Sequence, residues 1–537
     1  MAATEVPDVT VVVAVYNTMP YLTACLESVV EQTLGVDRIA VVAVDDGSTD
    51  GSGAELDRFA AAHPGLLTVL RQPNSGGPAA PNNRALEVAT GRYVFFLGAD
   101  DHLGTESLER LVTAADQHDA DVVFGRMVGT NDRHVHQKIY RQTDLDLDLY
   151  DSELPFALAN TKLFRRSLVE EQGLRFPEDL KIGSDQTFTI AALVHSRRTC
   201  VLGDYTFYYA VRRHDASNIS YDATWRDRLW SARRIMDEVA TQLPPGERRD
   251  AVLRRHLTWE LAKLLREDFL ELDEDEQVEL VEGVGKLCDT YFTDDLKQLI
   301  GVKRRIRLCL AEARRVDLLR ELLAREREHG DPPFVAEAER AFAAYPGYAG
   351  DRGVPREWYE LFDETVGGRL RDGVRVSSTR LTRRGLALEG SLGATPGHVV
   401  VGVHLRDVER RHAGGARSAR QPEELPPAAP VDTRVEPSDD LRRGPASTFA
   451  TVVPLERLGR GGIVAPRLRV QLGGHAYDLP VHCGHLLTRP EHVRWHGLRR
   501  VRTLAVLDDS GNLVVESSTL GWSSSMRRVA QRLRRRR

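Results

Sequence analysis

The sequence IAVVAVDDGSTDGS at residues 39–52 decides the fold. Its first six residues are apolar and rich in valine, which is typical of a strand buried on both faces of a sheet. Asp45 and Asp46 follow at once, and turn-forming residues complete the segment. In an open α/β sheet, ligands bind beyond the carboxyl ends of the strands. The segment therefore predicts a strand that delivers two carboxylates to a ligand site.

The residues around this segment alternate between predicted strands and helices. Further strands are predicted at 9–15, 67–70, 93–97 and 122–124, and helices at 21–32, 54–62 and 81–90. Such alternation predicts a Rossmann-like α/β domain with a mostly parallel sheet and helices on both sides. We expect this domain to span residues 1–222.

The rest of the chain changes character twice. Residues 223–350 are rich in Leu, Ala, Arg and Glu with helical spacing and predict a helical connector region. Short strand-like runs between turn signals predict a C-terminal β-sandwich over residues 351–525. Its stretch 413–447 is rich in Pro, Gly and charge and predicts a flexible insert. Residues 526–537 form a basic tail.

Charge and hydropathy limit the possible surroundings of the chain. The net charge of −6 gives no general attraction to nucleic acid, so no nucleic-acid partner is expected. The tail at 526–537 could contact an anionic membrane surface or be a solvated tail.

No signal peptide and no long apolar segment is recognisable. Their absence predicts a cytoplasmic protein, with peripheral contact to the inner face of the membrane as an option. Five scattered cysteines without a C-x-x-C pair predict reduced thiols.

Two candidate sites follow the first two strands. Tyr16 could stack on a nucleobase, although the neighbouring Asn17 and Thr18 could equally cap a helix. Asp45 and Asp46 could accept hydrogen bonds from the uracil imide and the ribose hydroxyls. The alternative is a capped turn, because Ser48, Thr49 and Asp50 are good N-cap residues.

A third site borders the strand at 93–97. Asp100 and Asp101 could hold a hard divalent cation, Mn²⁺ or Mg²⁺, through oxygen. That cation would bridge a diphosphate and offset the charge that develops as the nucleotide leaves. The alternative is an acidic turn that opens the next helix.

The fourth site lies further along the chain. Asp185 could be a general base that takes a proton from an acceptor hydroxyl, or the N-cap of a helix over 186–194. Arg212 and Arg213 could clamp phosphates. His214 could be a further metal ligand or an exposed loop histidine.

Four ordered motifs resemble the GT-A domain of family 2 glycosyltransferases. They are VAVYNTMPYLTACLESVVEQTL at 13–34, VDDGSTDGS at 44–52, NSGGPAAPNNRALEVATGRYVFFLGADD at 74–101 and LFRRSLVEEQGLRFPEDLKIGSDQTF at 163–188. The resemblance implies an inverting, single-displacement transfer of a hexose or N-acetylhexosamine from a nucleotide-sugar donor, expected to be a UDP-sugar, without a covalent sugar–enzyme intermediate.

The resemblance also assigns roles to residues. Tyr16, Asp45 and Asp46 would contact the nucleotide, Asp100 would bind the metal, and Asp185 would be the base. From their positions in the sequence we also expect Asp101 and His214 as metal ligands, and Ala14, Asn17, Asn74, Asp100 and Arg212 in the nucleotide site.

The wider layout is similar to Gram-positive wall teichoic acid glycosyltransferases, in which C-terminal sandwich modules mediate trimer formation. It implies a cell-envelope polysaccharide, teichoic-acid-like polymer or lipid-linked glycan as acceptor, and a homo-oligomer formed through the C-terminal domain.

Three departures from the family pattern stand in this chain. Gly98 replaces the first acid of the D-x-D motif, Asn82 replaces an arginine, and Ser184 replaces the glutamate before the base. Gly98 and Ser184 would suit a catalytically weakened protein that acts as a glycan-binding or scaffold module. A nucleotidyltransferase shares the sheet but would carry a glycine-rich basic loop after the first strand, and residues 15–17 have none.

Overall fold

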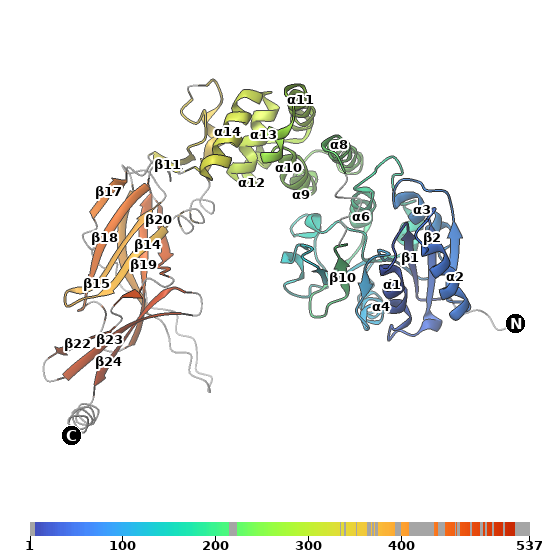
Figure 1. Cartoon of the computed structure of the whole chain (residues 1–537), viewed down its shortest axis with the longest axis horizontal. Coiled ribbons are helices and arrows are strands. Elements are labelled where there is room, and N and C mark those ends of the chain that lie inside the picture. Colours follow the sequence, from blue (N-terminus) through green and yellow to red (C-terminus); the bar gives the residue numbers. More distant parts are fainter. Residues whose placement is uncertain are drawn as a thin grey trace. The chain divides into compact units, whose positions relative to one another are not determined.

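The computed structural model describes residues 6–520, apart from residues 214–222, 408–433, 439–445 and shorter gaps between residues 333 and 510. The internal contacts divide the chain into two units, residues 1–300 with 307–316, and residues 301–306 with 317–537 (Figure 1). The boundary expected at residue 222 therefore does not separate two units, because the first helices of the connector region belong to the first one.

A seven-stranded sheet forms the centre of the first unit. Its strands, in spatial order, are β3 (Leu67–Arg71), β2 (Ile39–Asp45), β1 (Val9–Val15), β4 (Tyr93–Phe96), β8 (Leu163–Arg165), β6 (Val122–Gly125) and β9 (Thr199–Leu202). Every neighbouring pair is parallel except those that involve β8. The predicted α/β class with a mostly parallel sheet is confirmed.

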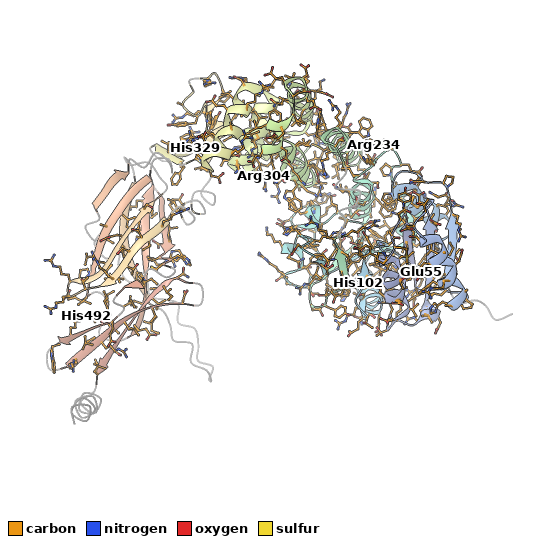
Figure 2. The ribbon with its side chains drawn as sticks, viewed as in Figure 1. Glu55, His102, Arg234, Arg304, His329 and His492 are labelled. Carbon is orange, nitrogen blue, oxygen red and sulfur yellow. The ribbon has the colours of Figure 1, made fainter. Side chains whose placement is uncertain are left out.

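Helices cover this sheet, as the sequence pattern predicts. They include α1 (Tyr21–Val30), α2 (Ser52–Ala62), α3 (Ala79–Val88), α4 (Ser107–His118) and α6 (Ser184–His195). Val11 and Val13 of β1 pack in one core with Leu22 of α1, and each buried side chain of this size stabilises the fold by about 1.5–3 kcal/mol. Glu55 of α2, labelled in Figure 2, accepts a hydrogen bond from Thr23 of α1 at 2.7 Å.

A small second sheet lies next to the site described below. Strand β10 (Tyr208–Val211) runs antiparallel to β5 (His102–Leu103) and parallel to β7 (Met127–Thr130). The β5 strand follows β4 closely in the chain, so β10 brings residues 208–213 to the carboxyl end of β4. The pattern of the sequence did not predict this sheet, because its strands are only two to four residues long.

The connector region is helical, as predicted, but it is shorter than expected. Its main helices are α8 (Trp225–Gln242), α9 (Glu247–Arg255), α11 (Glu274–Tyr291), α12 (Asp294–Leu299), α13 (Val302–Glu312) and α14 (Val316–His329). Helix α8 starts at a capping box on Thr224 and packs against α6. Strands β11 (Phe334–Glu337) and β12 (Arg340–Ala343) lie in the last part of the region predicted as helical, and β12 pairs with β13 (Glu360–Leu361). Pro332 follows α14 at a position where a helix would need a backbone N–H.

The C-terminal region consists of two largely antiparallel sheets. One has the order β17, β18, β15, β14 (Val374–Leu381) and β21 (Leu487–Thr488). The other has the order β16, β19, β24 (Leu513–Leu520), β23 and β22 (Glu491–His496), with β20 (His475–Pro480) paired to β19. The strand-like runs predicted from sequence, at 386–390, 399–405, 450–455, 468–472 and 504–507, overlap β15 (Gly385–Leu392), β16 (Val399–Asp407), β18 (Ala446–Pro454), β19 (Gly462–Leu472) and β23 (Arg499–Leu507). That the two sheets form one sandwich stays a prediction.

The sequence also predicted a flexible insert at 413–447 and a basic tail at 526–537. The insert predicted at 413–447 contains the strand β17 (Arg434–Ser438), which pairs with β18, so it is not a loop throughout. Its remaining residues up to 445 and the basic tail 526–537 lie outside the described residues. Within residues 6–520 as described, no helix has the length and apolar character needed to cross a bilayer.

Candidate functional site

The candidate site forms where three parallel strands end together. Val15 at the end of β1 pairs with Asp45 at the end of β2, and β4 runs parallel to β1 on the other side. Ala14, predicted to line the nucleotide site, is partly buried beside this edge and pairs with Val44. The residues that follow the three strands, predicted from sequence to act together, are therefore brought to one edge of the sheet.

Tyr16 and Asn17 occupy the turn after β1. The Tyr16 side chain is 46 % exposed, so its ring is accessible to a planar ligand. The Asn17 side-chain oxygen accepts a hydrogen bond from the Thr49 amide at 2.8 Å, and the Asn17 amide donates to the Ser48 hydroxyl. Helix α1 has Pro20 as its N-cap and no side-chain cap, so the alternative that Asn17 or Thr18 caps it is wrong. Asn17 instead joins the turn after β1 to the turn after β2.

Asp45 and Asp46 are both buried, and both accept hydrogen bonds from residues of the surrounding turns. Asp45 accepts a hydrogen bond from the Ser48 amide at 2.9 Å. Asp46 accepts from the Gln72 side chain at 2.7 Å and from the hydroxyl and amide of Ser75 at 2.9 and 3.0 Å. A carboxylate that satisfies several donors of another loop fixes the position of that loop. Nucleotide contact by Asp45 and Asp46 stays a prediction, and the roles of Gln72 and Ser75 had no signal in the sequence.

The loop held by Asp46 also contains Asn74. Its side-chain oxygen accepts a hydrogen bond from the Gly76 amide at 2.7 Å. The Asn74 backbone lies so close to Gly47 that a Cβ at residue 47 would be 2.8 Å from the Asn74 nitrogen. Gly47 also has a φ of +80°, which favours glycine. The packing of these two turns therefore requires glycine in the DDG motif.

Asp101 has a structural role that the sequence did not predict. It is 5 % exposed, and its two oxygens accept hydrogen bonds from the Tyr208 hydroxyl and the Val211 amide, both at 2.6 Å. Burial, together with the negative charge of Asp100, raises the pKa of Asp101 to about 6. Because both oxygens are already engaged by the second sheet, the structure does not favour the predicted role of Asp101 as a metal ligand.

The same contacts explain the glycine in place of the first acid of the D-x-D motif. The Gly98 amide donates to the Tyr208 hydroxyl at 3.0 Å. A Cβ at residue 98 would lie 2.7 Å from the Asp101 carboxylate and 3.1 Å from the Tyr208 hydroxyl. A side chain at residue 98 would force this buried pair to shift, so Gly98 is part of a packed turn.

Asp100 is linked through Arg213 to the turn after β1. Its carboxylate forms an ion pair with Arg213 at 2.8 Å, and both side chains are 14 % exposed. Arg213 also donates to the Asn17 carbonyl at 3.2 Å and so links the end of β10 to the turn after β1. Arg212 is exposed, and its backbone amide donates to the Thr130 carbonyl. A phosphate clamp by Arg212 stays a prediction.

The metal prediction rests on few ligands. Among the residues that the structure describes, no group of three or more His, Cys, Asp or Glu side chains could hold a metal ion. His214, predicted as a ligand, lies outside the described residues. The hard oxygen atoms of Asp100 fit Mg²⁺ or Mn²⁺ in kind. Among the described residues, the predicted ligand set is thereby reduced to the Asp100 carboxylate, and a diphosphate would have to supply further oxygens.

Asp185 lies in the first turn of α6. The N-cap of this helix is Gly183, which has a φ of +85°, so the alternative that Asp185 is the N-cap residue is wrong. The side chain is partly buried. Burial raises the pKa of Asp185, while the positive charges of Arg255 and Lys162 oppose that rise. A carboxylate with a raised pKa is a stronger base than a solvated one, which suits general-base catalysis.

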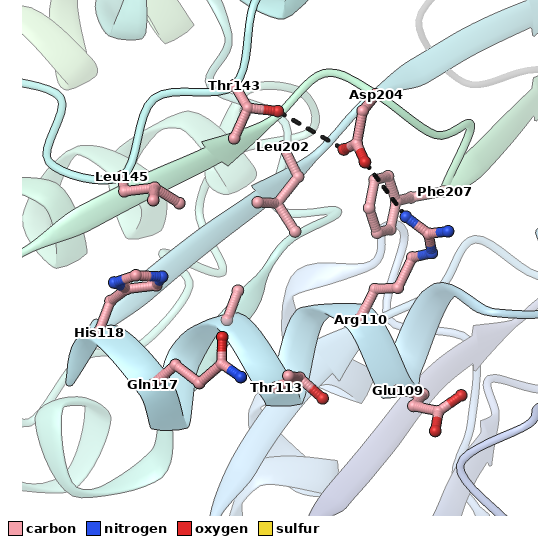
Figure 3. Close-up of a pocket in the computed structure, with 11 residues that line it drawn as sticks. Glu109, Arg110, Thr113, Gln117, His118, Thr143, Leu145, Leu202, Asp204 and Phe207 are labelled. Atoms are coloured by element: carbon pink, nitrogen blue, oxygen red, sulfur yellow. Dashed lines mark hydrogen bonds and ion pairs between the residues drawn. The ribbon is translucent and has the colours of Figure 1, made fainter.

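A separate cavity of about 390 Å³ lies along α4 (Figure 3). Arg110 of α4 forms an ion pair with Asp204 at 3.2 Å on its wall. None of the residues predicted for the site lines this cavity. Its lining comprises Glu109, Arg110, Thr113, Ala114, Gln117, His118, Thr143, Leu145, Leu202, Asp204 and Phe207.

Comparison with known families gives two adjacent matches. Residues 10–173 match the glycosyl transferase family 2 model, and residues 226–323 match the glycosyl transferase TarS linker domain. The chain is 36 % identical over 205 residues to a poly(ribitol-phosphate) beta-glucosyltransferase of Bacillus spizizenii, covering 38 % of this chain and 32 % of that one. It is 30 % identical over 308 residues to the poly(ribitol-phosphate) beta-N-acetylglucosaminyltransferase TarS of Staphylococcus aureus, covering 57 % and 53 %. The chain thus spans a third to a half of these relatives.

Solved structures agree with these matches. A crystal structure of S. aureus TarS aligns over 96 % of this chain and 86 % of its own length with a TM-score of 0.65 and 22 % identity, which shows a shared fold. TarS 1–349 in complex with UDP-GlcNAc aligns over 66 % of this chain and 99 % of its own length, with a TM-score of 0.57 and 26 % identity. The predicted resemblance to family 2 glycosyltransferases and the predicted fold class are confirmed.

Proposed function

We propose that this chain, which contains a family 2 glycosyltransferase domain followed by a TarS-type linker domain, transfers a sugar from a UDP-sugar to a hydroxyl of a ribitol-phosphate or similar cell-envelope polymer. The observation that carries the proposal is the meeting of Tyr16, Asp45 and Asp100 at one edge of the matched domain. Relatives named poly(ribitol-phosphate) glycosyltransferases, and the complex of TarS 1–349 with UDP-GlcNAc, support the donor and acceptor classes.

On the donor side, exposed and buried residues would have different tasks. Tyr16 would stack on the uracil ring, because its side chain is accessible at the carboxyl edge of the sheet. Asp45 would accept hydrogen bonds from uracil or ribose next to the turn that it already holds. Asp46, Asn17 and Asn74 would shape this nucleotide pocket mainly by fixing the loops around it. Arg212 would contact phosphate from the end of β10.

On the acceptor side, Asp185 would be the general base. The acceptor O–H bond breaks and its proton moves to an Asp185 carboxylate oxygen. In the same displacement the acceptor oxygen bonds to the anomeric carbon, and the bond from that carbon to the nucleotide phosphate breaks. The electron pair of the broken bond leaves with the nucleoside diphosphate. Because attack occurs opposite the leaving group, the configuration at the anomeric carbon inverts.

A divalent cation is also part of this proposal. Asp100 would hold it, and when bound it would offset the negative charge of the departing diphosphate. Asp101 is left out of the proposed ligand set because Tyr208 and Val211 already occupy its oxygens.

We also propose that the chain forms a homo-oligomer through the C-terminal sheets. Residues 526–537 are proposed to contact the membrane surface. Sedimentation analysis of the full chain tests the first. Liposome flotation with and without residues 526–537 tests the second, and equal binding by both forms would remove the role of the tail.

The enzymatic proposal is tested by nucleotide release from UDP-, GDP- and dTDP-sugars with a ribitol-phosphate polymer, in the presence of Mn²⁺ or EDTA. We expect turnover with a UDP-sugar that requires the polymer and falls in EDTA. If no donor is bound or turned over, the enzyme proposal fails, and the glycan-binding scaffold is the remaining candidate. Binding of the polymer without turnover would identify that scaffold directly.

A further inference from the structure

The turn that leads into the helix of Asp185 packs against a helix of the connector region. Gly183, the N-cap of α6, has a φ of +85°. A Cβ at residue 183 would lie 2.6 Å from the Ser231 hydroxyl and 2.9 Å from a methyl group of Ile235, both on α8. Helix α8 therefore packs directly on this glycine, and Asp185 follows two positions later in the first turn of α6 (Figure 1).

A buried hydrogen bond fixes the backbone at the same point. Ser231 is 5 % exposed, and its hydroxyl donates to the Ile182 carbonyl at 2.8 Å. This carbonyl belongs to the planar peptide that joins Ile182 to Gly183. The Gly183 carbonyl in turn accepts from the Gln186 amide at 3.1 Å. The hydrogen bond of Ser231 thus sets the peptide plane from which the first turn of α6 begins.

A second residue of the connector region contacts the first turn itself. Arg255, at the end of α9, is 8 % exposed, and its guanidinium donates to the Gln186 side chain at 2.7 Å. The same nitrogen pairs with Glu260 at 2.9 Å. Side chains three or four positions apart are neighbours on an α-helix, whereas the wider π-helical turn at His256–Leu261 brings these two together over five positions. The π turn therefore places the Arg255 guanidinium against the residue that follows Asp185.

Two surface ion pairs connect the same segments. Lys181 pairs with Asp227 at 3.3 Å, and Asp179 pairs at 3.3 Å with Arg234, which is labelled in Figure 2. Their side chains are largely accessible to water, so each pair contributes only about 0–1 kcal/mol. The two buried contacts are therefore the main connection between the helices.

The sheet side of α6 is anchored separately. Phe188 is 1 % exposed and stacks on Phe176, with 4.3 Å between the ring centroids. It also meets Phe96 and Phe164 edge to face, at 5.4 and 5.3 Å. These rings fix α6 about one turn after Asp185. The placement of the Asp185 side chain then depends on how the turn before it is held.

We propose that Ser231 and Arg255 are positioning residues for sugar transfer, through which the connector helices hold Asp185 where it can take the proton of the acceptor hydroxyl. This inference rests on the proposed function of Asp185 as the base. Neither positioning residue exchanges a proton, because the hydroxyl proton moves to Asp185 and then to solvent. A displacement of about 1 Å at a reacting group can slow catalysis about 100-fold. Both residues lie in the segment that matches the TarS linker domain, so this segment takes part in catalysis and is not only a spacer.

The main test is a double-mutant cycle in the full chain. Ser231→Ala and Arg255→Met are each made in the wild type and in Asp185→Asn. The readouts are kcat for UDP-GlcNAc with a ribitol-phosphate polymer and the Kd for UDP. We expect each change to lower kcat about 10-fold or more in the wild type, but less than about 2-fold in Asp185→Asn, where no base is left to position. The Kd for UDP should not change.

Two exposed positions on α8 supply matched controls. Arg233 pairs with Asp237, and Thr241 donates to the Glu238 carbonyl, both within the same helix. Arg233→Met and Thr241→Ala should therefore keep the wild-type kcat. Two results would overturn the inference. One is a wild-type kcat in both test variants, and the other is the same fold loss in both backgrounds, which indicates that the contacts only support the fold.

A second measurement covers the case in which Arg255→Met does not fold. Hydrogen exchange of peptides that cover residues 179–190 is compared in the wild type, Ser231→Ala and Thr241→Ala. Loss of the buried hydrogen bond should speed exchange in Ser231→Ala about 10-fold, with no change in the control. Equal protection in Ser231→Ala and the wild type would overturn the inference.

Failure of the inference and failure of the proposed function give different results. If the wild type turns over no donor, the proposed function fails, and the role of the connector helices in transfer fails with it. If Asp185→Asn keeps wild-type turnover, the transferase stands and only the positioning of a base is excluded.

Discussion

Replacing Tyr208 by Phe should loosen the turn that carries Asp100. The Tyr208 hydroxyl is buried, donates to the Asp101 carboxylate at 2.6 Å and accepts from the Gly98 amide at 3.0 Å. Phe has nearly the same volume, so the change leaves no large cavity. It leaves a buried carboxylate oxygen and a buried N–H without this partner, each of which costs about 1–3 kcal/mol. We expect a local loss of about 3 kcal/mol at pH 7.5.

The loss should depend on pH in a defined direction. Burial raises the pKa of Asp101 to about 6, so the folded protein binds this proton more tightly than the unfolded chain. The group therefore makes the folded state less stable as pH rises from about 4 to about 6. The Tyr208 hydrogen bond lowers the pKa of Asp101 and so reduces the stability that the folded state loses as pH rises. At pH 5 Asp101 is largely neutral, so its bond to Tyr208 is weaker and its loss costs less.

Hydrogen exchange measured by mass spectrometry on peptides around residues 93–104 and 207–213 tests this prediction. About 3 kcal/mol corresponds to exchange that is about 100-fold faster in Tyr208→Phe at pH 7.5, after correction for intrinsic rates, with a smaller factor at pH 5. Tyr209→Phe is the matched control, because Tyr209 is partly exposed and stacks on His102. Equal protection in wild type and Tyr208→Phe would refute the argument that this hydroxyl clamps Asp101.

Three further changes test the remaining parts of the site. Tyr16→Ala should weaken UDP binding by about 1–3 kcal/mol through lost stacking, whereas Tyr16→Phe should retain it in calorimetry. Asp46→Asn should lower the Tm by several degrees in a thermal shift assay, because Ser75 and Gln72 lose a carboxylate acceptor; an unchanged Tm would contradict its role in holding this loop. Asp185→Asn should lower kcat by about 10²–10⁴ while UDP still binds, and wild-type turnover by this variant would exclude it as the base.

The central sheet could be predicted because its strands carry a strong local signal. Val9–Val15 and Ile39–Asp45 are continuously apolar up to the site, which is the pattern of strands buried on both faces. Strand β8 has only three residues, Leu163–Arg165, and its antiparallel position between β4 and β6 depends on tertiary packing. The helical connector was predicted in kind, but the strands after Pro332 were missed because each has at most four residues.

Within the site, the sequence named candidate residues but not their contacts. Asp45, Asp100 and Asp185 became candidates because they follow strands or match ordered motifs, and their binding and catalytic roles stay predictions. The role of Asp101 depends on Tyr208, which is 107 positions away in the chain, and no local pattern relates the two. The contact of Ser231 with Ile182 carried no signal either, because 49 positions separate the two residues in the chain. In the sequence, Gly98 stands where the D-x-D motif has its first acid, and only its contact with Tyr208 in the folded structure explains the glycine.

We propose that the chain transfers a sugar in one displacement, with Asp185 as base. The most direct measurement is the anomeric configuration of the product formed from an α-linked UDP-GlcNAc donor and a ribitol-phosphate acceptor, determined by NMR. We expect a β-linked sugar with the wild type, and transfer that is about 100-fold slower or more with Asp185→Asn. An α-linked product, or equal transfer by Asp185→Asn, would contradict it.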